Sequence, residues 1–411
     1  MRAITESRCT SARRRAAGIS KWLALAILVS MVRPATATDH VMAPGEPWPA
    51  ATEVEPGDRI LLAPGIHKNV GVLSLSGAPG RPIRIGSVDP TQPSTLLGDA
   101  WSLDVAGASH LEFESLLVIS GRSGAIRIRG SAATPGRNIA LRNLFITPTP
   151  GVLVPVGLDA DGVEDLRISN LRVALWQRAA IELRNASRVR MTGLTLQGDR
   201  RASAGIRLDS GVRDVRVERS ALLIIGGSGV AAGLPTAPHP DSTASTPAVE
   251  DLVVERCIFE RVAIPVTVGS AERVLVDRCT IVEPTAAVFE LRRPKAGWSA
   301  AGEVRIRHNL VAWKVNGLAR LFIDDQPDAA LDLGPNLWWA ATMPTALQWL
   351  GGFPDGAAPQ VVDIDPRLVP RSNKPLAAPA AGFGHLASPG PGVRDGSDPP
   401  RTSEPRPTDR P

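Results

Sequence analysis

The sequence has no tyrosine, and aromatic residues make up only 4% of its 411 positions. A ligand-binding surface built from stacked aromatic side chains is therefore not expected. Lysine is also scarce, because only Lys21, Lys68, Lys295, Lys314 and Lys374 are present. Any catalytic lysine must be one of these few residues.

The sequence motifs of nucleotide and zinc enzymes are missing as well. The chain contains no Walker loop, no dinucleotide-binding fingerprint, no HExxH, no G-x-S-x-G and no zinc-type spacing of Cys and His. No segment approaches the roughly eighteen consecutive apolar residues that a membrane-spanning helix needs. We therefore expect neither a nucleotide- or zinc-dependent enzyme nor a stable membrane span.

Residues 1–37 have the order of a signal peptide. The basic stretch Arg13–Lys21 is followed by the apolar run Trp22–Val32 and then by Ala35-Thr36-Ala37. We predict cleavage after Ala37 and a periplasmic or secreted protein. An uncleaved membrane anchor is the alternative.

The net charge of +5 is concentrated in this same segment. Residues 1–37 contain seven basic side chains and one acidic side chain, so the rest of the chain has a net charge of −1. A nearly neutral mature protein offers no electrostatic basis for nucleic-acid binding. No nucleic-acid partner is therefore expected.

One short unit recurs through most of the chain. It begins with a strand of alternating apolar residues and continues through a second short strand, a turn and a third alternating strand. The first strands start at Leu111, Ile139, Leu166, Val189, Val215, Leu252, Val274 and Val304, mostly 22–30 residues apart. A propeller blade needs about 40–50 residues. Three short strands per unit instead predict an all-β parallel β-helix, in which each unit is one rung.

Small or turn-forming residues follow the first strand of each unit. They are Ser115, Asn143, Asn170, Gly193, Ser220, Cys257, Cys279 and Asn309. In stacked rungs such side chains lie about 4.8 Å apart, close enough for a hydrogen-bonded ladder. Ordinary turn residues are the alternative. Cys257 and Cys279, one rung apart, form either a disulfide, which an oxidising compartment allows, or a stack of free thiols.

The flanks of the repeat resemble a known scaffold. Residues 54–67, with Pro56-Gly57-Asp58, and residues 80–85 resemble the opening rungs of right-handed parallel β-helix proteins such as chondroitinase B and the alginate lyases of polysaccharide lyase family 6. His67 replaces the usual Tyr, and Asp363–Leu368 resembles the segment that closes such chains. The resemblance covers roughly residues 50–384. It implies a single-stranded right-handed parallel β-helix.

These observations divide the chain into three parts. Residues 1–37 are the signal peptide, and residues 38–384 are the β-helix domain, with opening rungs at 54–88, regular repeats at 109–323 and a closing segment at 324–384. Residues 385–411 contain seven prolines and almost no large apolar residue. This tail is expected to be disordered.

In the resembling families the substrate groove follows the sheet formed by the third strands. Alternation points the following side chains outward there: Arg127, Arg129, Glu182, Arg184, Arg207, Asp209, Glu290 and Arg292. Guanidinium groups bind uronate or sulfate in bidentate fashion, so we expect an acidic polysaccharide as the partner. Mutual pairing of these charges on a solvated face is the alternative.

The longest interruption of the repeat, residues 226–250, leaves from the end of a third strand and should border the groove. Long loops on a rigid scaffold often contain functional residues. His239 is the imidazole candidate for catalysis, and Asp241 is the carboxylate candidate for substrate binding. A tolerated insertion is the alternative.

The resemblance also implies a lyase site. In that family two acids bind a metal, and a lysine five residues after the second acid is the base. Glu290 is followed by Lys295 at this spacing, which implies Glu290 as a Ca²⁺ ligand and Lys295 as the base for β-elimination at a uronate. The sequence departs from the family at Val288, which replaces the first acid, and it lacks the family's Arg-His-Gly segment. A glycoside hydrolase would instead use Glu182 and Asp209, one rung apart.

Two functions stay open at this point. The first is a polysaccharide lyase or a related carbohydrate-active enzyme that acts on an acidic polysaccharide. The second is a non-catalytic polysaccharide-binding or surface-structural β-helix protein. We expect a monomer, and no cofactor other than Ca²⁺.

Overall fold

A computed structural model describes residues 37–131, 134–149, 151, 153–235, 246–295, 297–313, 320–326, 329–340 and 360–361. The chain divides into two compact units, Met1–Thr38 and Asp39–Pro411, and every strand belongs to the second unit. No helix in the described ranges is long and apolar enough to cross a membrane. Residues 1–36 of the predicted signal peptide and the predicted tail at 385–411 lie outside the described residues.

The second unit is built from three kinds of strand that follow one another along the chain. The first strands form a twelve-stranded sheet: β1 (Asp39–Met42), β2 (Arg59–Leu62), β5 (Ile83–Ser87), β8 (Ser109–Glu114), β11 (Gly136–Arg142), β14 (Val163–Ser169), β17 (Ser187–Thr192), β20 (Val212–Glu218), β22 (Val249–Glu255), β24 (Ala271–Asp277), β27 (Glu303–Arg307) and β30 (Ala330–Leu333).

The second and third strands form one larger sheet. The second strands are β3 (Ile66–Lys68), β6 (Ser94–Leu97), β9 (Leu116–Ile119), β12 (Phe145–Thr147), β15 (Arg172–Ala174), β18 (Thr195–Gln197), β25 (Thr280–Val282), β28 (Leu310–Trp313), β31 (Leu337–Ala340) and β32 (Gln360–Val361). The third strands are β4 (Val72–Leu73), β7 (Trp101–Ala106), β10 (Gly124–Arg129), β13 (Val154–Asp161), β16 (Trp176–Arg184), β19 (Ala204–Leu208), β26 (Phe289–Leu291) and β29 (Phe322–Asp324). β21 (Ala221–Ala232) and β23 (Ile258–Val268) each run continuously through a second and a third strand position.

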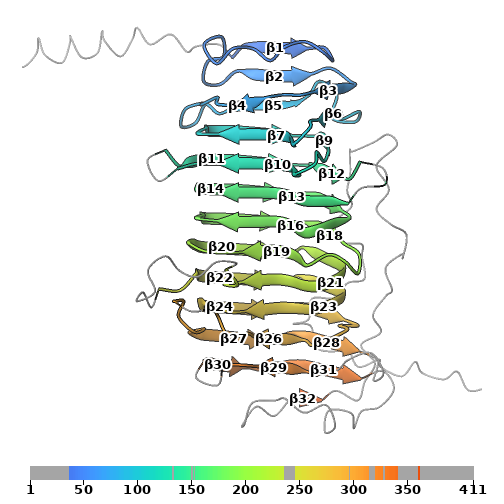
Figure 1. Ribbon diagram of the computed structural model, residues 1–411, viewed down its shortest axis with the longest axis vertical. Coiled ribbons are helices and arrows are strands. Elements are labelled where there is room, and N and C mark those ends of the chain that lie inside the picture. Colours follow the sequence, from blue (N-terminus) through green and yellow to red (C-terminus); the bar gives the residue numbers. More distant parts are fainter. Residues whose placement is uncertain are drawn as a thin grey trace, which may run out of the picture. The chain divides into compact units, whose positions relative to one another are not determined.

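Each strand pairs in parallel with the equivalent strand of the next rung, so the rungs stack along one axis (Figure 1). The register of the first sheet pairs Leu111 with Ile139 and Ile139 with Leu166. Farther along, Leu252 pairs with Val274 and Val274 with Val304. The predicted first strands are therefore confirmed in position and register, although each begins one to three residues before the predicted start, and the fold is a parallel β-helix.

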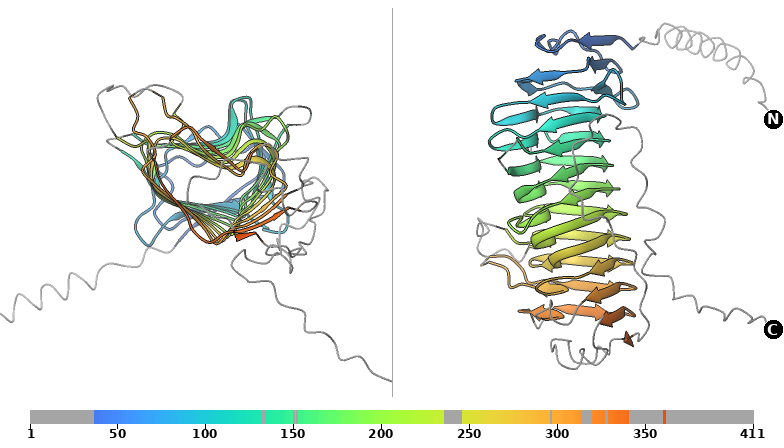
Figure 2. Two further views of the ribbon diagram at one scale, coloured as in Figure 1. Left: turned by 90° about the horizontal axis from the view of Figure 1, so that it is seen from below. Right: turned by 90° about the vertical axis from the view of Figure 1, so that its right-hand side faces the viewer.

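Alternation along each strand explains why the helix closes around an apolar column. In β8, Leu111 and Phe113 are fully buried, and Glu112 between them points outward. Seen along the axis, the rungs superpose around a common interior (Figure 2). Trp176 and Phe259 fill that interior with no exposed surface. Burying each such large apolar side chain contributes about 1.5–3 kcal/mol, which offsets the ordering of the chain.

The corner after the first strand is made by a residue with positive φ. Ser115, Asn143 and Asn170 occupy it in three successive rungs, with φ values of 56°, 53° and 53°. Asn tolerates this left-handed conformation better than most residues. On the exposed side of this corner, the side chain of Asn170 donates to Asn143 Oδ1 at 3.0 Å, which is the predicted hydrogen bond between rungs.

The predicted ladder was wrong in one respect, because its members belong to two successive positions. From Ser220 onward the corner itself is occupied by Arg219, Arg256, Arg278 and His308, all with positive φ. The residue after each of these points into the interior. That buried position holds Leu116, Leu144, Leu171 and Leu194 in earlier rungs and Ser220, Cys257, Cys279 and Asn309 in later ones.

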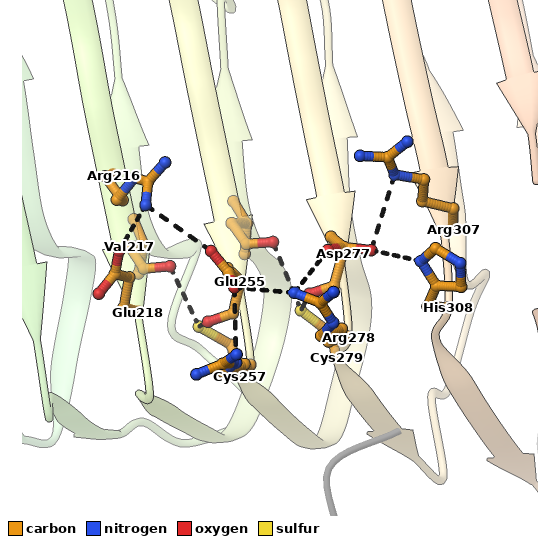
Figure 3. Close-up of polar contacts among 12 residues, drawn as sticks. Arg216, Val217, Glu218, Glu255, Cys257, Asp277, Arg278, Cys279, Arg307 and His308 are labelled. Atoms are coloured by element: carbon orange, nitrogen blue, oxygen red, sulfur yellow. Dashed lines mark hydrogen bonds and ion pairs between the residues drawn. The ribbon is translucent and has the colours of Figure 1, made fainter. Parts of the chain in front are cut away.

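The later members of this buried position form an internal polar ladder. Cys257 and Cys279 are both free thiols and lie on neighbouring rungs (Figure 3). Their Sγ atoms donate to the backbone oxygens of Glu255 and Asp277 at 3.3 and 3.4 Å. Of the two predicted arrangements, the structure contains the stack of free thiols.

Charged side chains tie the same rungs together outside this corner (Figure 3). Asp277 accepts a hydrogen bond from His308 Nδ1 at 2.8 Å and lies 3.5 Å from Arg278 Nη1 and 3.7 Å from Arg307 Nε. Arg278 Nη1 also approaches Glu255 Oε1 at 3.3 Å. These pairs link neighbouring rungs of the first sheet, as expected for a structural network.

Candidate functional site

The third strands present two rows of outward side chains, and we call these rows together the strip. The first row runs in register through Asp104, Arg127, Asp159, Glu182, Arg207, Ala231, Thr267 and Glu290. The second row contains Arg129, Asp161 and Arg184 in register, with Asp209 and Arg292 directly after β19 and β26. All eight side chains predicted to share this face belong to the strip.

In the N-terminal part of the strip, one carboxylate pairs with two arginines. Asp104 accepts hydrogen bonds from Arg127 Nε at 3.1 Å and from Arg129 Nη2 at 3.1 Å. The guanidinium of Arg127 also lies 5.1 Å from the ring centroid of Trp101, a cation–π distance. Asp104 was not among the predicted site residues. The alternation of Leu103, Asp104 and Val105 could have identified Asp104 as an outward residue and β7 as a third strand.

The central part of the strip is organised around Arg184. Its guanidinium donates to Asp159 at 2.8 Å, to Glu182 at 3.2 Å and to Asp161 at 3.3 Å. Arg178 Nε donates to the other oxygen of Glu182 at 2.7 Å. Burial raises the pKa of Asp159, and the charge of Arg184 opposes this rise. Sequence reasoning missed Asp159, Asp161 and Arg178.

Beside this cluster, Asp209 and Arg207 form the least satisfied pair of the strip. Their closest charged atoms are 3.9 Å apart. Asp209 Oδ1 and Arg207 Nε are both buried, and neither has a hydrogen-bond partner among the described residues. Burial raises the pKa of Asp209, the charge of Arg207 opposes the rise, and the charge of Glu182 adds to it. The positive charge of Lys295 also acts to lower the pKa of Asp209.

Toward the C-terminal end, Glu290 is fully engaged. Arg292 Nη2 lies 2.9 and 2.8 Å from its two carboxylate oxygens, and Thr267 Oγ1 donates to one of them at 3.1 Å. Thr267 in turn shares a hydrogen bond of 2.8 Å with Ser228. In the described part of the chain, no group of three or more His, Cys, Asp or Glu side chains could hold a metal ion. These residues do not fit the Ca²⁺ site that the resemblance implied at Glu290.

The structure therefore brings together the predicted residues of the third strands and adds the carboxylates that neutralise them. Arg127 and Arg129 share Asp104, and Arg292 pairs with Glu290. The positive and negative charges of the strip therefore nearly balance. Asp209 and Arg207 are the pair whose hydrogen bonds are incomplete. His239 and Asp241, predicted to border it, lie outside the described residues.

Comparisons with known proteins bear on the fold. No protein-family model matches the sequence, and no curated protein matches it. Among solved structures, an alginate lyase from Paenibacillus sp. str. FPU-7 is similar, with a TM-score of 0.52 and 16% identity over 72% of this chain and 99% of that one.

Two further solved structures are less similar. A mannuronic acid specific polysaccharide family 6 lyase from human gut microbiota has a TM-score of 0.39 and 13% identity, over 80% of this chain and 92% of that one. The pectate lyase Pel9A has a TM-score of 0.38 and 16% identity, over 87% of this chain and 97% of that one. The likeness to the Paenibacillus alginate lyase, at 16% identity, concerns the fold, and it confirms the predicted right-handed parallel β-helix.

Proposed function

We propose that this protein acts on an acidic polysaccharide that lies along the strip, by β-elimination at a uronate. The observation that supports this proposal is the incomplete hydrogen bonding of Asp209 and Arg207. A buried carboxyl group with a raised pKa lies beside an arginine whose Nε has no hydrogen-bond partner among the described residues, and the charge of Lys295 acts on the same carboxyl group. Carboxyl groups whose pKa is shifted by burial and by specific charged neighbours are typical of sites that move protons.

The proposed reaction needs three groups. Arg207 neutralises the uronate carboxylate, which acidifies the C5 proton. Lys295 takes this proton, the C4–O bond breaks and the C4–C5 double bond forms. Asp209, whose pKa is raised by burial, is the group that gives a proton to the leaving glycosidic oxygen. No step is assigned to Glu290 or to Ca²⁺, because Arg292 and Thr267 occupy the oxygens of Glu290.

The test is the ultraviolet absorbance of the unsaturated uronate product. The purified protein is incubated with alginate, chondroitin or pectate, with Ca²⁺ and with a chelator. We expect absorbance to rise on at least one polymer in the presence of chelator. Lys295→Ala should lower the rate by about 100-fold or more, as for loss of a general base. The matched control is Lys68→Ala, an exposed lysine on β3.

A second candidate function is polysaccharide binding without turnover. It is favoured by the closed ion pairs of Arg127 with Asp104 and of Arg292 with Glu290, which leave a preformed polar surface. In that case no polymer gives an unsaturated product, and Lys295→Ala binds its polymer as the wild type does. Either function fits the proposed periplasmic or secreted location and a monomeric protein.

A further inference from the structure

A hollow lies beside the strip, at the turns that join second strands to third strands. Two adjoining pockets of about 590 and 400 Å³ share Arg200 and Gly226. We call them together the turn pocket. Ser228 and Arg292, which belong to the hydrogen-bonded C-terminal part of the strip, also line it. The turn pocket is therefore continuous with the proposed polysaccharide path.

The wall of the turn pocket is a rigid loop, Asp199–Ser203. The Asp199 carboxylate accepts hydrogen bonds from the backbone N–H groups of Arg201 at 2.7 Å and Ala202 at 3.1 Å. The next rung holds the loop through Gly226 N–H to Asp199 O at 3.1 Å and through Gly227 N–H to Ala202 O at 2.9 Å. A loop fixed in this way loses little conformational entropy when it binds a ligand.

The two glycines of the next rung allow this close approach. A Cβ atom on Gly226 would lie 2.0 Å from the backbone oxygen of Arg200, and one on Gly227 would lie 2.0 Å from that of Ser203. Neither position can accept a side chain without displacing the loop. The chain therefore fixes the backbone of Arg200 and Arg201 and leaves both side chains exposed.

The charge of the turn pocket differs from that of the strip. Arg261 pairs with Glu283 at 3.3 Å, and Arg292 pairs with Glu290. Over the described ranges, however, no carboxylate forms an ion pair with Arg200 or Arg201. The neighbouring Asp199 carboxylate is already used by backbone N–H groups. Two adjacent guanidinium groups are thus available to an anion from outside.

We infer that the turn pocket binds an anionic substituent, a sulfate or a carboxylate, of the polysaccharide that lies on the strip. The inference rests on the proposed function for the polymer's path but not for the chemistry. Two guanidinium groups on a fixed loop match the planar, bidentate recognition of such oxyanions. The volume of the turn pocket suits a sugar substituent that branches from a chain on the strip. The proposed substrate class is therefore a polysaccharide whose anionic substituents branch from the chain toward the turn pocket.

The test compares affinities for three polymers with the full chain. The probes are sulfated chondroitin, unsulfated chondroitin and alginate, measured by calorimetry at two salt concentrations. Arg200→Gln/Arg201→Gln should weaken binding about tenfold or more and reduce its salt dependence. A loss confined to sulfated chondroitin identifies sulfate, and an equal loss on all three polymers identifies carboxylate. Arg213→Gln, an exposed arginine on β20, is the matched control and should bind as the wild type does.

Unchanged affinity of the double variant for every polymer that the wild type binds would overturn the inference and leave the proposed function standing. Binding without an unsaturated product would overturn the proposed chemistry and leave the turn pocket standing. Absence of binding to all three polymers would overturn both. Because both arginines are exposed, the double variant is expected to unfold at the wild-type temperature, and this is checked first.

Discussion

Arg207 in β19 and Asp209 directly after it belong to the same face of the sheet, yet their closest charged atoms stay 3.9 Å apart. Elsewhere in the strip, Arg184 and Asp159 approach to 2.8 Å, as do Arg292 and Glu290. Asp209 is only 4% exposed, so its carboxyl group has lost water without gaining a close partner. Such a group favours its neutral form.

The raised pKa of Asp209 predicts a specific dependence of stability on pH. Its pKa in the folded protein lies above the ordinary value of 3.8, so the native state holds more protons than the unfolded state between the two values. Stability must therefore fall as pH rises through this window. Asp209→Asn removes the penalty, so the variant should gain unfolding temperature relative to the wild type as pH rises above about 4.

Asp165→Asn is the control for this prediction, because it should show the opposite slope. The hydrogen bond from Arg188 lowers the pKa of Asp165, so its contribution is present above the ordinary Asp pKa and is lost as pH falls. Asn also tolerates the positive φ of this position. Thermal unfolding from pH 3 to pH 8 measures both variants. Parallel curves for Asp209→Asn and the wild type would show that burial does not shift Asp209.

Removal of Arg184 should destabilise the protein strongly. Arg184→Gln leaves Asp159, Asp161 and Glu182 close together without their shared cation. We expect a loss of about 2 kcal/mol or more in the free energy of unfolding, measured in urea. Adding Glu182→Gln should recover part of this loss, because one of the repelling charges is removed.

The exposed pair of Arg188 and Asp165 provides the comparison for Arg184. Arg188→Gln breaks a pair with side chains 51% and 29% exposed, so it should cost less than about 1 kcal/mol. Equal losses for Arg184→Gln and Arg188→Gln would mean that the central cluster is screened like an ordinary surface ion pair.

The fold could be predicted because burial enforces alternation in every rung. Leu111, Ile139 and Leu166 mark the first strands, and the structure pairs them in that register. The same logic was available for β13, where Leu158 and Ala160 alternate with Asp159 and Asp161. Alternation alone does not assign this segment to a third strand, because the turns between second and third strands vary in length and hide the repeat.

The pairing of the charged residues could not be predicted from alternation alone. The partner of Arg127 is Asp104, 23 residues earlier, and the partner of Arg184 is Asp159, 25 residues earlier. Which residues meet depends on the lengths of all the turns in one rung. The same difficulty shifted the predicted ladder by one position, because Ser220 points inward and Asn170 lies at the corner.

This difference between the two positions predicts different costs for two asparagines. Asn309 is fully buried, accepts from Cys279 N–H at 2.8 Å and donates to Val276 O at 3.1 Å and Asn336 Oδ1 at 3.0 Å. Asn309→Ala should cost about 2–3 kcal/mol, because it leaves buried partners unsatisfied. Asn170→Gly removes one exposed hydrogen bond but keeps the left-handed corner, and should cost less than about 1 kcal/mol. Urea unfolding of both variants measures the two losses in the free energy of unfolding. A larger loss for Asn170→Gly than for Asn309→Ala would contradict the prediction.

The stacked thiols predict the pattern of alkylation by iodoacetamide. Burial raises the pKa of Cys279, and the neighbouring Cys257 side chain adds to this rise. Since the thiolate is the reactive form, both residues should stay unlabelled in the folded protein. Denaturation without reductant should expose two free thiols, so that peptide mapping finds both residues labelled. Labelling that appears only after reduction would show that Cys257 and Cys279 form a disulfide, and the rungs would then have to move to join the two sulfur atoms.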